Sequence, residues 1–257
     1  MFIVVINITR SHRAQIDFRV LIYFPDFYST LIGAVMLLAE AFWINSQIRG
    51  MNIESKSEIC INIGSSTGKF MEQSQPYIKD LVLGPLSLKF SRVVNVDIKD
   101  EAGVDLVADF LTTEGRRAIQ NLKPKVIMVS NLLEHLPDPL LGVQALCKLT
   151  AKNEILVLTG PRFYPYHPDP IDNRFRPTLK KIRRLMSSDF EILALEHVWG
   201  GTVLTANRYT VSTADLILWS KRQINFRNII MNPKLVLRTV RNIFYPASAF
   251  CGVFRKL

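Results

Sequence analysis

From Glu58 onward, short apolar runs alternate with amphipathic segments along the chain. Short apolar runs bounded by polar residues or glycine are typical of strands buried in a parallel sheet. Apolar positions three and four residues apart are typical of helices. The alternation therefore predicts an α/β fold with a doubly wound, mostly parallel sheet. We place its strands at 59–63, 92–98, 104–108, 126–129 and 155–159, followed by an antiparallel C-terminal pair at 192–198 and 211–219.

Capping residues mark the helices between these strands. Asp138 precedes Pro139 and a periodic apolar face, which predicts a helix that ends near Thr150. Thr178 precedes a second amphipathic helix, whose lysines and arginines we expect to face solvent. Another helix is predicted over 232–245.

The N-terminal segment contains an apolar run at 27–44 that is close to bilayer-spanning length but includes Glu40. We expect a helix that packs on the domain or lies at an interface rather than one that spans a membrane. The chain opens with apolar residues rather than a basic region, so we expect no secretory signal. The predicted organisation is an apolar, helical extension over 1–50, the α/β domain over 51–220 and a basic amphipathic tail over 221–257.

Composition narrows the class of protein. The 257 residues are 48% hydrophobic and 21% charged, which is typical of a globular protein and excludes a disordered one. Cys60, Cys147 and Cys251 form no CxxC pair and have no cluster of histidines beside them, so we predict neither a disulfide framework nor a metal site. This cysteine usage favours a cytoplasmic protein.

The net charge of +10 is concentrated toward the C-terminus, because no acidic residue follows Asp215. The basic residues of this region alternate with apolar ones. Two interpretations remain open. The segment is either a solvated helix packed on the domain or a peripheral contact with an anionic surface such as a membrane. No nucleic-acid-binding motif accompanies the charge, so we expect no nucleic-acid partner.

Two strand ends carry residues that suit a nucleoside. Small residues over 62–68 follow the first predicted strand, and they would let the backbone approach a ligand. Asp97 ends the second strand, and its carboxylate is an acceptor suited to paired ribose hydroxyls. Ligands bind at the carboxyl ends of the strands in such sheets. The first loop lacks the G-x-G-x-x-G pattern of dinucleotide binding and the lysine of a P-loop.

The segments GSSTG, NVDIKD, VADF and SNLLEHLPDP follow successive strands, and this ordered set resembles the class I, Rossmann-like S-adenosylmethionine-dependent methyltransferases of the NxLEHxPDP type. The resemblance spans about residues 58 to 220. It implies S-adenosylmethionine as cofactor, with the first loop at its methionine portion, Asp97 at the ribose and Asp109 at the adenine amine. The implied cofactor-binding residues are Asn62, Gly64, Ser65, Ser66, Gly68, Asp97, Ile98, Asp109, Phe110, Asn131 and Leu132. The sequence departs from the family at Asn62, usually acidic, and at Ser66, usually glycine.

A long loop over 160–177 follows the fifth predicted strand and contains five prolines, which exclude a regular helix. Its YPYHxDPIDxxFRP segment resembles one found in methyltransferase-like proteins associated with surface glycan synthesis. A stiff, aromatic and charged loop at this edge is well placed to form the acceptor pocket. The predicted acceptor contacts are Tyr164, Tyr166, Asp172, Arg174 and Arg176.

Methyl transfer to a hydroxyl needs alignment of donor and acceptor and a base. We predict His167 as the base, with Asp169 or Asp172 orienting its imidazole or acting as the base directly. The alternative is that His167 and these aspartates only hold the proline-rich loop together. Glu134 and His135, after the fourth strand, either lie near the acceptor or hydrogen-bond neighbouring loops.

Three functions fit the pattern to different degrees. The first is a methyltransferase acting on a small-molecule or glycan-type acceptor. The second is a non-catalytic binding or scaffold protein on the same fold, motivated by Asn62 and Ser66. The third is an NAD-dependent sugar-modifying enzyme, which is disfavoured because the pyrophosphate glycines and a Tyr-x-x-x-Lys pair are missing.

Overall fold

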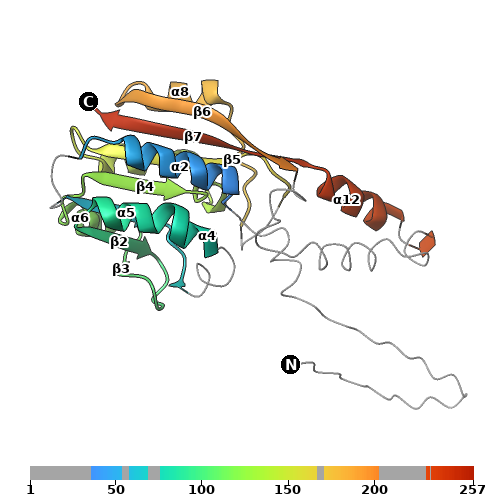
Figure 1. Ribbon diagram of the computed structural model, residues 1–257, viewed down its shortest axis with the longest axis horizontal. Coiled ribbons are helices and arrows are strands. Elements are labelled where there is room, and N and C mark those ends of the chain that lie inside the picture. The colour runs from blue at the N-terminus through green and yellow to red at the C-terminus, as the bar shows by residue number, and fades with distance from the viewer. Residues whose placement is uncertain (1–35, 54–57, 69–75, 167–170, 203–229, 232) are drawn as a thin grey trace, which may run out of the picture.

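The computed structural model describes residues 36–53, 58–68, 76–166, 171–202, 230–231 and 233–257. Its centre is a seven-stranded sheet with the order β3-β2-β1-β4-β5-β7-β6 (Figure 1). The strands are β1 (Ile59–Ile63), β2 (Arg92–Asp97), β3 (Leu106–Val107), β4 (Val126–Ser130), β5 (Ile155–Phe163), β6 (Phe190–Thr202) and β7 (Pro246–Lys256).

The pairing of the strands identifies the fold. β1 lies between β2 and β4 and runs parallel to both, while β4 also pairs parallel with β5. β7 runs antiparallel between β5 and β6. This strand order, with a reversed strand inserted next to the edge, is that of the class I methyltransferase fold. The predicted doubly wound, mostly parallel sheet with an antiparallel C-terminal strand pair is confirmed.

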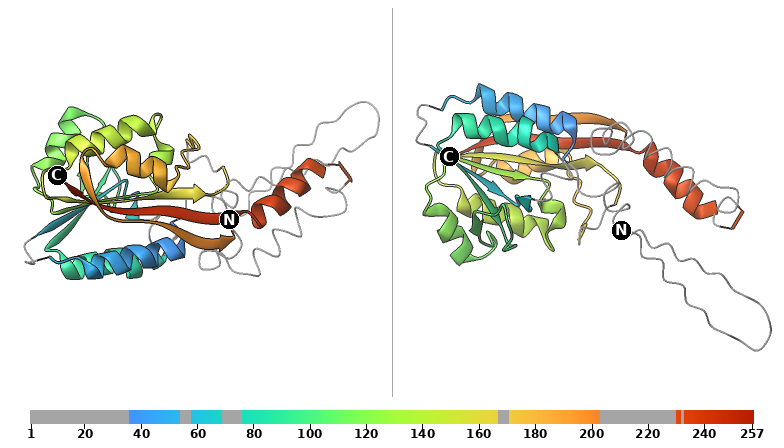
Figure 2. Two further views of the ribbon diagram at one scale, coloured as in Figure 1. Left: turned by 90° about the horizontal axis from the view of Figure 1, so that it is seen from above. Right: turned by 60° about the horizontal axis from the view of Figure 1, so that its bottom comes forward.

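Helices cover both faces of the sheet (Figures 1 and 2). One face carries α2 (Leu38–Gly50), α4 (Pro76–Ile78), a π-helical turn over Lys79–Leu83 and α5 (Gly84–Lys89). The other carries α6 (Thr113–Gln120), a 3-10 turn over Leu133–His135, α7 (Pro139–Leu149) and α8 (Leu179–Met186). A further helix, α12 (Pro233–Ile243), projects away from these two layers (Figure 1).

Successive side chains of the buried strands point to opposite faces of the sheet, so the apolar core consists of two clusters, one on each face. Ile61 and Ile63 of β1 pack in the cluster under α6, α7 and α8, whereas Cys60 packs in the cluster under α2 and α5. Both faces of the strand are therefore covered by apolar side chains. Strands covered on both sides appear in a sequence as continuous apolar runs, which is why the pattern located β1 at its observed bounds.

The predicted caps are present in the structure. The Asp138 carboxylate accepts hydrogen bonds from the backbone N–H groups of Leu140 at 2.8 Å and Leu141 at 3.3 Å, at the start of α7. Thr178 Oγ1 accepts one from the N–H of Lys181 at 3.1 Å, at the start of α8. These bonds satisfy donors that have no partner within a helix, and they fix where both helices begin.

The C-terminal boundary differs from the prediction. Residues 246–256 are not part of a tail, because β7 is buried along most of its length between β5 and β6. The predicted strand at 211–219 lies outside the described residues. Two of the cations assigned to the tail are paired within the domain: Lys256 Nζ lies 2.6 Å from Asp189 Oδ1, and Arg255 Nη1 lies 3.1 Å from Glu191 Oε2.

The N-terminal helix belongs to the domain. α2 packs on the sheet beside α5, and Ala41, Ile44 and Ile48 lie in the core under it. This confirms the domain-packed interpretation for the described part of the apolar run. Within the described ranges, no helix is long and apolar enough to cross a bilayer.

Candidate functional site

The turn after β1 and the end of β2 converge at the carboxyl edge of the sheet. The N–H of Gly64 donates to the carbonyl of Val96 at 2.8 Å, and the N–H of Ser66 donates to Asp97 Oδ2 at 2.9 Å. Asp97 Oδ1 accepts from the N–H of Lys99 at 3.1 Å. A carboxylate has about four acceptor sites, so Asp97 can also accept from a pair of hydroxyls. The structure thus brings together the two features on which the nucleoside prediction depends.

Two positions of this turn have left-handed backbone. Gly64 has φ of 72° and Ser66 has φ of 58°. Glycine adopts such a conformation readily, whereas a residue with a side chain, such as Ser66, pays about 1 kcal/mol or more for it. A Cβ on Gly64 would lie 2.9 Å from two carbons of the Leu132 side chain. The ends of β1 and β4 are therefore in contact.

A glycine that the sequence analysis did not single out completes this arrangement. The N–H of Gly68 donates to the carbonyl of Ala102 at 2.8 Å. Gly103 has φ of 93°, and a Cβ on it would lie 2.5 Å from the backbone nitrogen of Gly68. The loops after β1 and β2 touch at this point through their backbone atoms. Gly103 alone in a loop gave no sequence signal, because its partner is far away along the chain.

The amide at position 62 has a local partner. Asn62 Nδ2 donates to Asn95 Oδ1 at 3.1 Å, and the two residues are paired in register between β1 and β2. Asn62 is buried. Two amides can satisfy one another across neighbouring strands without a buried charge, which gives a structural reason for the departure from the acidic residue of the resembled family.

Asp109 lies in a tight turn after β3. Its Oδ1 accepts from the N–H of Leu111 at 2.9 Å, and its carbonyl accepts from the N–H of Thr112 at 3.0 Å. Phe110, the other predicted cofactor-binding residue of this turn, is buried. A Cβ on Gly115 would lie 1.9 Å from the Asp109 carbonyl oxygen. Only glycine lets the first turn of α6 approach Asp109 this closely.

We expect Gly115→Ala to destabilise the protein by about 2 kcal/mol, because a backbone atom must move to admit the methyl group. Urea denaturation measures the change. Gly50→Ala is the matched control, since a Cβ on Gly50 would meet nothing within 4 Å, and it should leave stability within about 0.5 kcal/mol. Equal stability of the two variants would contradict the close packing at Asp109.

A carboxyl group that was interpreted only as a polar interruption lies at the ends of β4 and β5. Glu40 of α2 is fully buried. Its Oε1 accepts from Thr159 Oγ1 at 2.6 Å and from Asn131 Nδ2 at 2.9 Å, and its Oε2 accepts from the N–H of Leu37 at 3.1 Å. Burial raises the pKa of Glu40 to about 7, although these hydrogen bonds oppose the rise. The Asn131 side chain is thus directed toward α2.

Two tyrosines extend this buried polar cluster. The Tyr77 hydroxyl donates to the carbonyl of Met36, and burial, reinforced by the charge of Glu40, raises the pKa of Tyr77. Tyr164, predicted to contact the acceptor, is buried in the same core cluster as Tyr77. Tyr164 therefore packs in the core between the end of β5 and the helices α2 and α4.

Glu134 and His135 connect the end of β4 to the proline-rich loop. Glu134 is buried, and burial raises its pKa to about 8 against the lowering effect of nearby Arg176. The carbonyl of Glu134 accepts from the N–H of Asn173 at 2.9 Å. His135 Nδ1 lies 2.6 Å from the carbonyl oxygen of Ile171. This contact corresponds to the loop-holding role considered for His135.

The predicted acceptor residues of the loop fall into two groups. Asp172 and Arg176 form an ion pair with Oδ2 and Nη2 2.8 Å apart, in which the aspartate is buried and the arginine is half-buried. Arg174 and Tyr166 are both exposed, and the Arg174 guanidinium lies 5.0 Å from the centre of the Tyr166 ring. The first pair stabilises the loop, whereas the second presents a cationic and aromatic surface. The proposed base His167 and its neighbour Asp169 lie outside the described residues.

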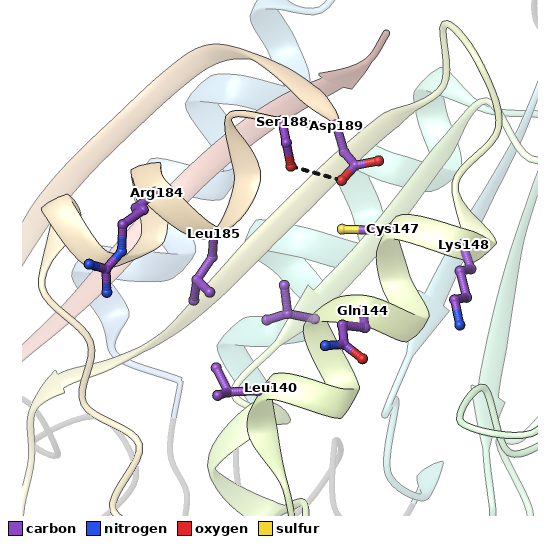
Figure 3. Close-up of a pocket in the computed structure, with 9 residues that line it drawn as sticks. Leu140, Gln144, Cys147, Lys148, Arg184, Leu185, Ser188 and Asp189 are labelled. Atoms are coloured by element: carbon purple, nitrogen blue, oxygen red, sulfur yellow. Dashed lines mark hydrogen bonds between the residues drawn. The ribbon is translucent and has the colours of Figure 1, made fainter.

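A groove of about 470 Å³ lies elsewhere, between α7 and α8 (Figure 3). Its lining includes Leu140, Cys147, Arg184 and Asp189. None of the predicted site residues contributes to it. The candidate site is therefore the constellation at the strand ends and not this groove.

No protein-family model matches the chain, and no curated protein matches it. Solved structures with similar folds include the N-methyltransferase NodS from Bradyrhizobium japonicum in complex with S-adenosyl-L-homocysteine, at 12% identity and a TM-score of 0.42, over 86% of this chain and 88% of that one. Coclaurine N-methyltransferase, bound to N-methylheliamine and S-adenosylhomocysteine, matches at 14% identity and a TM-score of 0.48, over 83% and 72%. The [4+2]-cyclase SpnF matches at 11% identity and a TM-score of 0.48, over 84% of this chain and 81% of that one. At identities of 11% to 14%, these similarities are similarities of fold alone.

Proposed function

We propose that this protein is an S-adenosylmethionine-dependent methyltransferase that acts on a small-molecule or glycan-type acceptor. The proposal is carried by one observation: the Asp97 carboxylate is directed onto the turn at Gly64, and it accepts from Ser66 at 2.9 Å. A carboxylate held beside a glycine turn, at the carboxyl edge of a doubly wound sheet, suits a ribose attached to a group that lies along the turn.

The residues around Asp97 fit the adenosyl part of this cofactor. Ile98 is 70% exposed although it directly follows the carboxylate, and an adenine ring would cover this apolar side chain. Asp109 and Phe110 follow β3 on the other side of Asp97. In this proposal they contact the base, and the 62–68 turn with Leu132 and the backbone of Asn131 contacts the methionine portion.

The bound cofactor would supply an electrophilic methyl group on a sulfonium, and the chain would align and deprotonate the acceptor. We assign proton removal to His167, with Asp169 orienting its ring. Tyr166 and Arg174 provide an exposed surface for an acceptor that carries hydroxyls or an anionic group. His135 holds the loop through Ile171, and its direct participation in proton removal is the alternative assignment.

Isothermal titration with S-adenosylmethionine and S-adenosylhomocysteine tests the proposal. We expect saturable binding of each with one site per chain, and no heat of binding with NADH under the same conditions. Absence of binding by both sulfur ligands would contradict the methyltransferase assignment. Binding of NADH alone would favour the sugar-modifying alternative.

A non-catalytic role on the same fold is the second candidate. It is favoured by Ser66 in left-handed backbone and by the Leu132 side chain packed over Gly64, where it occupies the space beside the turn. If this candidate is right, Ser66→Gly together with Leu132→Ala should create measurable affinity for S-adenosylhomocysteine that the parent chain lacks. Measurable affinity of the parent chain would contradict it.

A further inference from the structure

α12 exposes an apolar face that no part of the described structure covers. Leu237 is 69% exposed, Val240 38% and Phe244, just after the helix, 65%. Their spacing of three and four residues places them on one side of the helix. Met231, just before it, is 69% exposed. Figure 1 shows α12 extending away from the sheet and its covering helices.

Cations accompany this face and anions do not. Lys234 and Arg241 are exposed and lie on the same side as Leu237, at spacings of three and four residues. The helix sequence PKLVLRTVRNI contains no acidic residue, and the chain has none after Asp215. The surface is thus an apolar stripe with a basic border.

A second helix of the same protein provides an internal comparison. α8 is also amphipathic and basic, with Arg183 and Arg184 exposed. Its apolar side, however, is covered, since Ile182 and Met186 are fully buried in the core. The apolar face of α8 is therefore covered by the rest of the domain, whereas the apolar face of α12 is exposed.

The point of attachment of α12 relates it to the candidate site. α12 ends at Ile243, and β7 begins at Pro246. Ser248 of β7 pairs with Phe163, the last residue of β5, so the helix joins the sheet at the carboxyl edge. Trp199, opposite Ser248 on β6, is 57% exposed at the same end. An exposed tryptophan beside an amphipathic basic helix is typical of surfaces that meet a lipid interface.

We propose that α12 docks the protein onto an anionic lipid surface, lying in the plane of the head groups with Leu237, Val240 and Phe244 inserted. A helix with an apolar face and a basic border suits this position. Charge complementarity favours it over self-association, because a second copy would place the same cations against one another. It places the carboxyl edge of the sheet, with the candidate site, beside the lipid surface.

Co-sedimentation of the full chain with vesicles tests this proposal. We expect binding to phosphatidylcholine vesicles that contain about 30% phosphatidylglycerol, and at least about tenfold weaker binding to phosphatidylcholine alone. Lys234→Glu/Arg241→Glu should weaken binding to the anionic vesicles by at least about tenfold. Leu237→Ser/Phe244→Ser should weaken it by a similar factor, and this loss should persist at high salt.

Matched controls show whether vesicle binding depends on α12 itself or only on the net charge and the exposed apolar area of the whole protein. Arg183→Glu/Arg184→Glu changes the net charge by the same amount on α8, and Leu88→Ser/Leu141→Ser removes two other exposed leucines. Both should bind anionic vesicles as the parent chain does. Circular dichroism melts should show all four variants folded, since every substituted side chain is exposed.

Three results would overturn the proposal. The first is absence of binding by the parent chain to anionic vesicles. The second is an equal loss of vesicle binding for Arg183→Glu/Arg184→Glu and Lys234→Glu/Arg241→Glu. The third is a concentration-dependent dimer, seen in light scattering, that Leu237→Ser/Phe244→Ser abolishes while vesicle binding is unchanged. The last would assign the apolar face to a second copy of the chain. None of these measurements depends on cofactor binding, so the proposed methyltransferase activity can stand or fail separately.

Discussion

Replacing Asp97 with asparagine is expected to weaken S-adenosylmethionine binding about 100-fold, the largest effect on affinity of any substitution considered. The amide has one acceptor oxygen in place of two, and it carries no charge for hydrogen bonds from the ribose hydroxyls. It also cannot accept from both Ser66 and Lys99, whose N–H groups now reach separate oxygens at 2.9 and 3.1 Å. Isothermal titration of the purified variant measures the change.

Asp105→Asn is the matched control for Asp97→Asn. Asp105 also accepts from a backbone N–H group, but its partner is that of Asn95 in β2, at 2.8 Å, and not one in the turn at Gly64. It should lose a similar amount of stability and keep the affinity of the parent chain. Equal affinity of Asp97→Asn and Asp105→Asn for the cofactor would remove Asp97 from the binding site.

Glu40→Gln is expected to change the pH dependence of folding by about 3 kcal/mol between about pH 4.5 and pH 8. Burial raises the pKa of Glu40 from 4.5 to about 7 in the folded protein. As the pH rises above 4.5, the unfolded chain loses its proton first, so stability falls until the folded form ionises near pH 7. The glutamine variant has no such group and should escape this loss.

Urea denaturation of both proteins across this pH range gives the comparison. The amide replaces one oxygen of the Glu40 carboxyl group with an NH2 group, which changes its hydrogen bonds at every pH. The informative quantity is therefore how the difference in unfolding free energy varies with pH, and it should favour the variant increasingly above pH 4.5. Removing the charge of Glu40 also lowers the pKa of Glu134, which acts in the same direction. Glu191→Gln, at an exposed position of β6, should follow the parent profile. Parallel profiles for Glu40→Gln and the parent chain would contradict the burial of this carboxyl group.

Local patterns predicted the first five strands and the capped helices well. β1 was placed at its observed bounds, and Asp138 and Thr178 cap the helices they were expected to cap. A cap depends on residues that are neighbours along the chain, so the sequence shows it directly. A strand buried on both faces appears in the sequence as a continuous apolar run. β5 runs four residues further than expected, to Phe163, because its pairing with β7 continues past Thr159.

The features that sequence reasoning missed depend on contacts between distant segments. Glu40 appeared as an interruption in an apolar run, since its hydrogen-bond partners Asn131 and Thr159 lie far along the chain. The need for glycine at position 103 arises only from its close contact with the backbone of Gly68. β7 combines small residues with a basic end, and a buried central strand has no alternation of polar and apolar positions, so it was interpreted as a tail.

The placement of β7 has a consequence for the order of folding. β6 pairs with β7 and not with β5, so the segment up to Thr202 cannot join the sheet before residues 246–256 are synthesised. Until then the edge of β5 and the inner face of β6 remain open to pairing with other chains. Completion of this fold therefore waits on the synthesis of residues 246–256, and a nascent chain stalled short of Pro246 would be a substrate for chaperones rather than a smaller version of the domain.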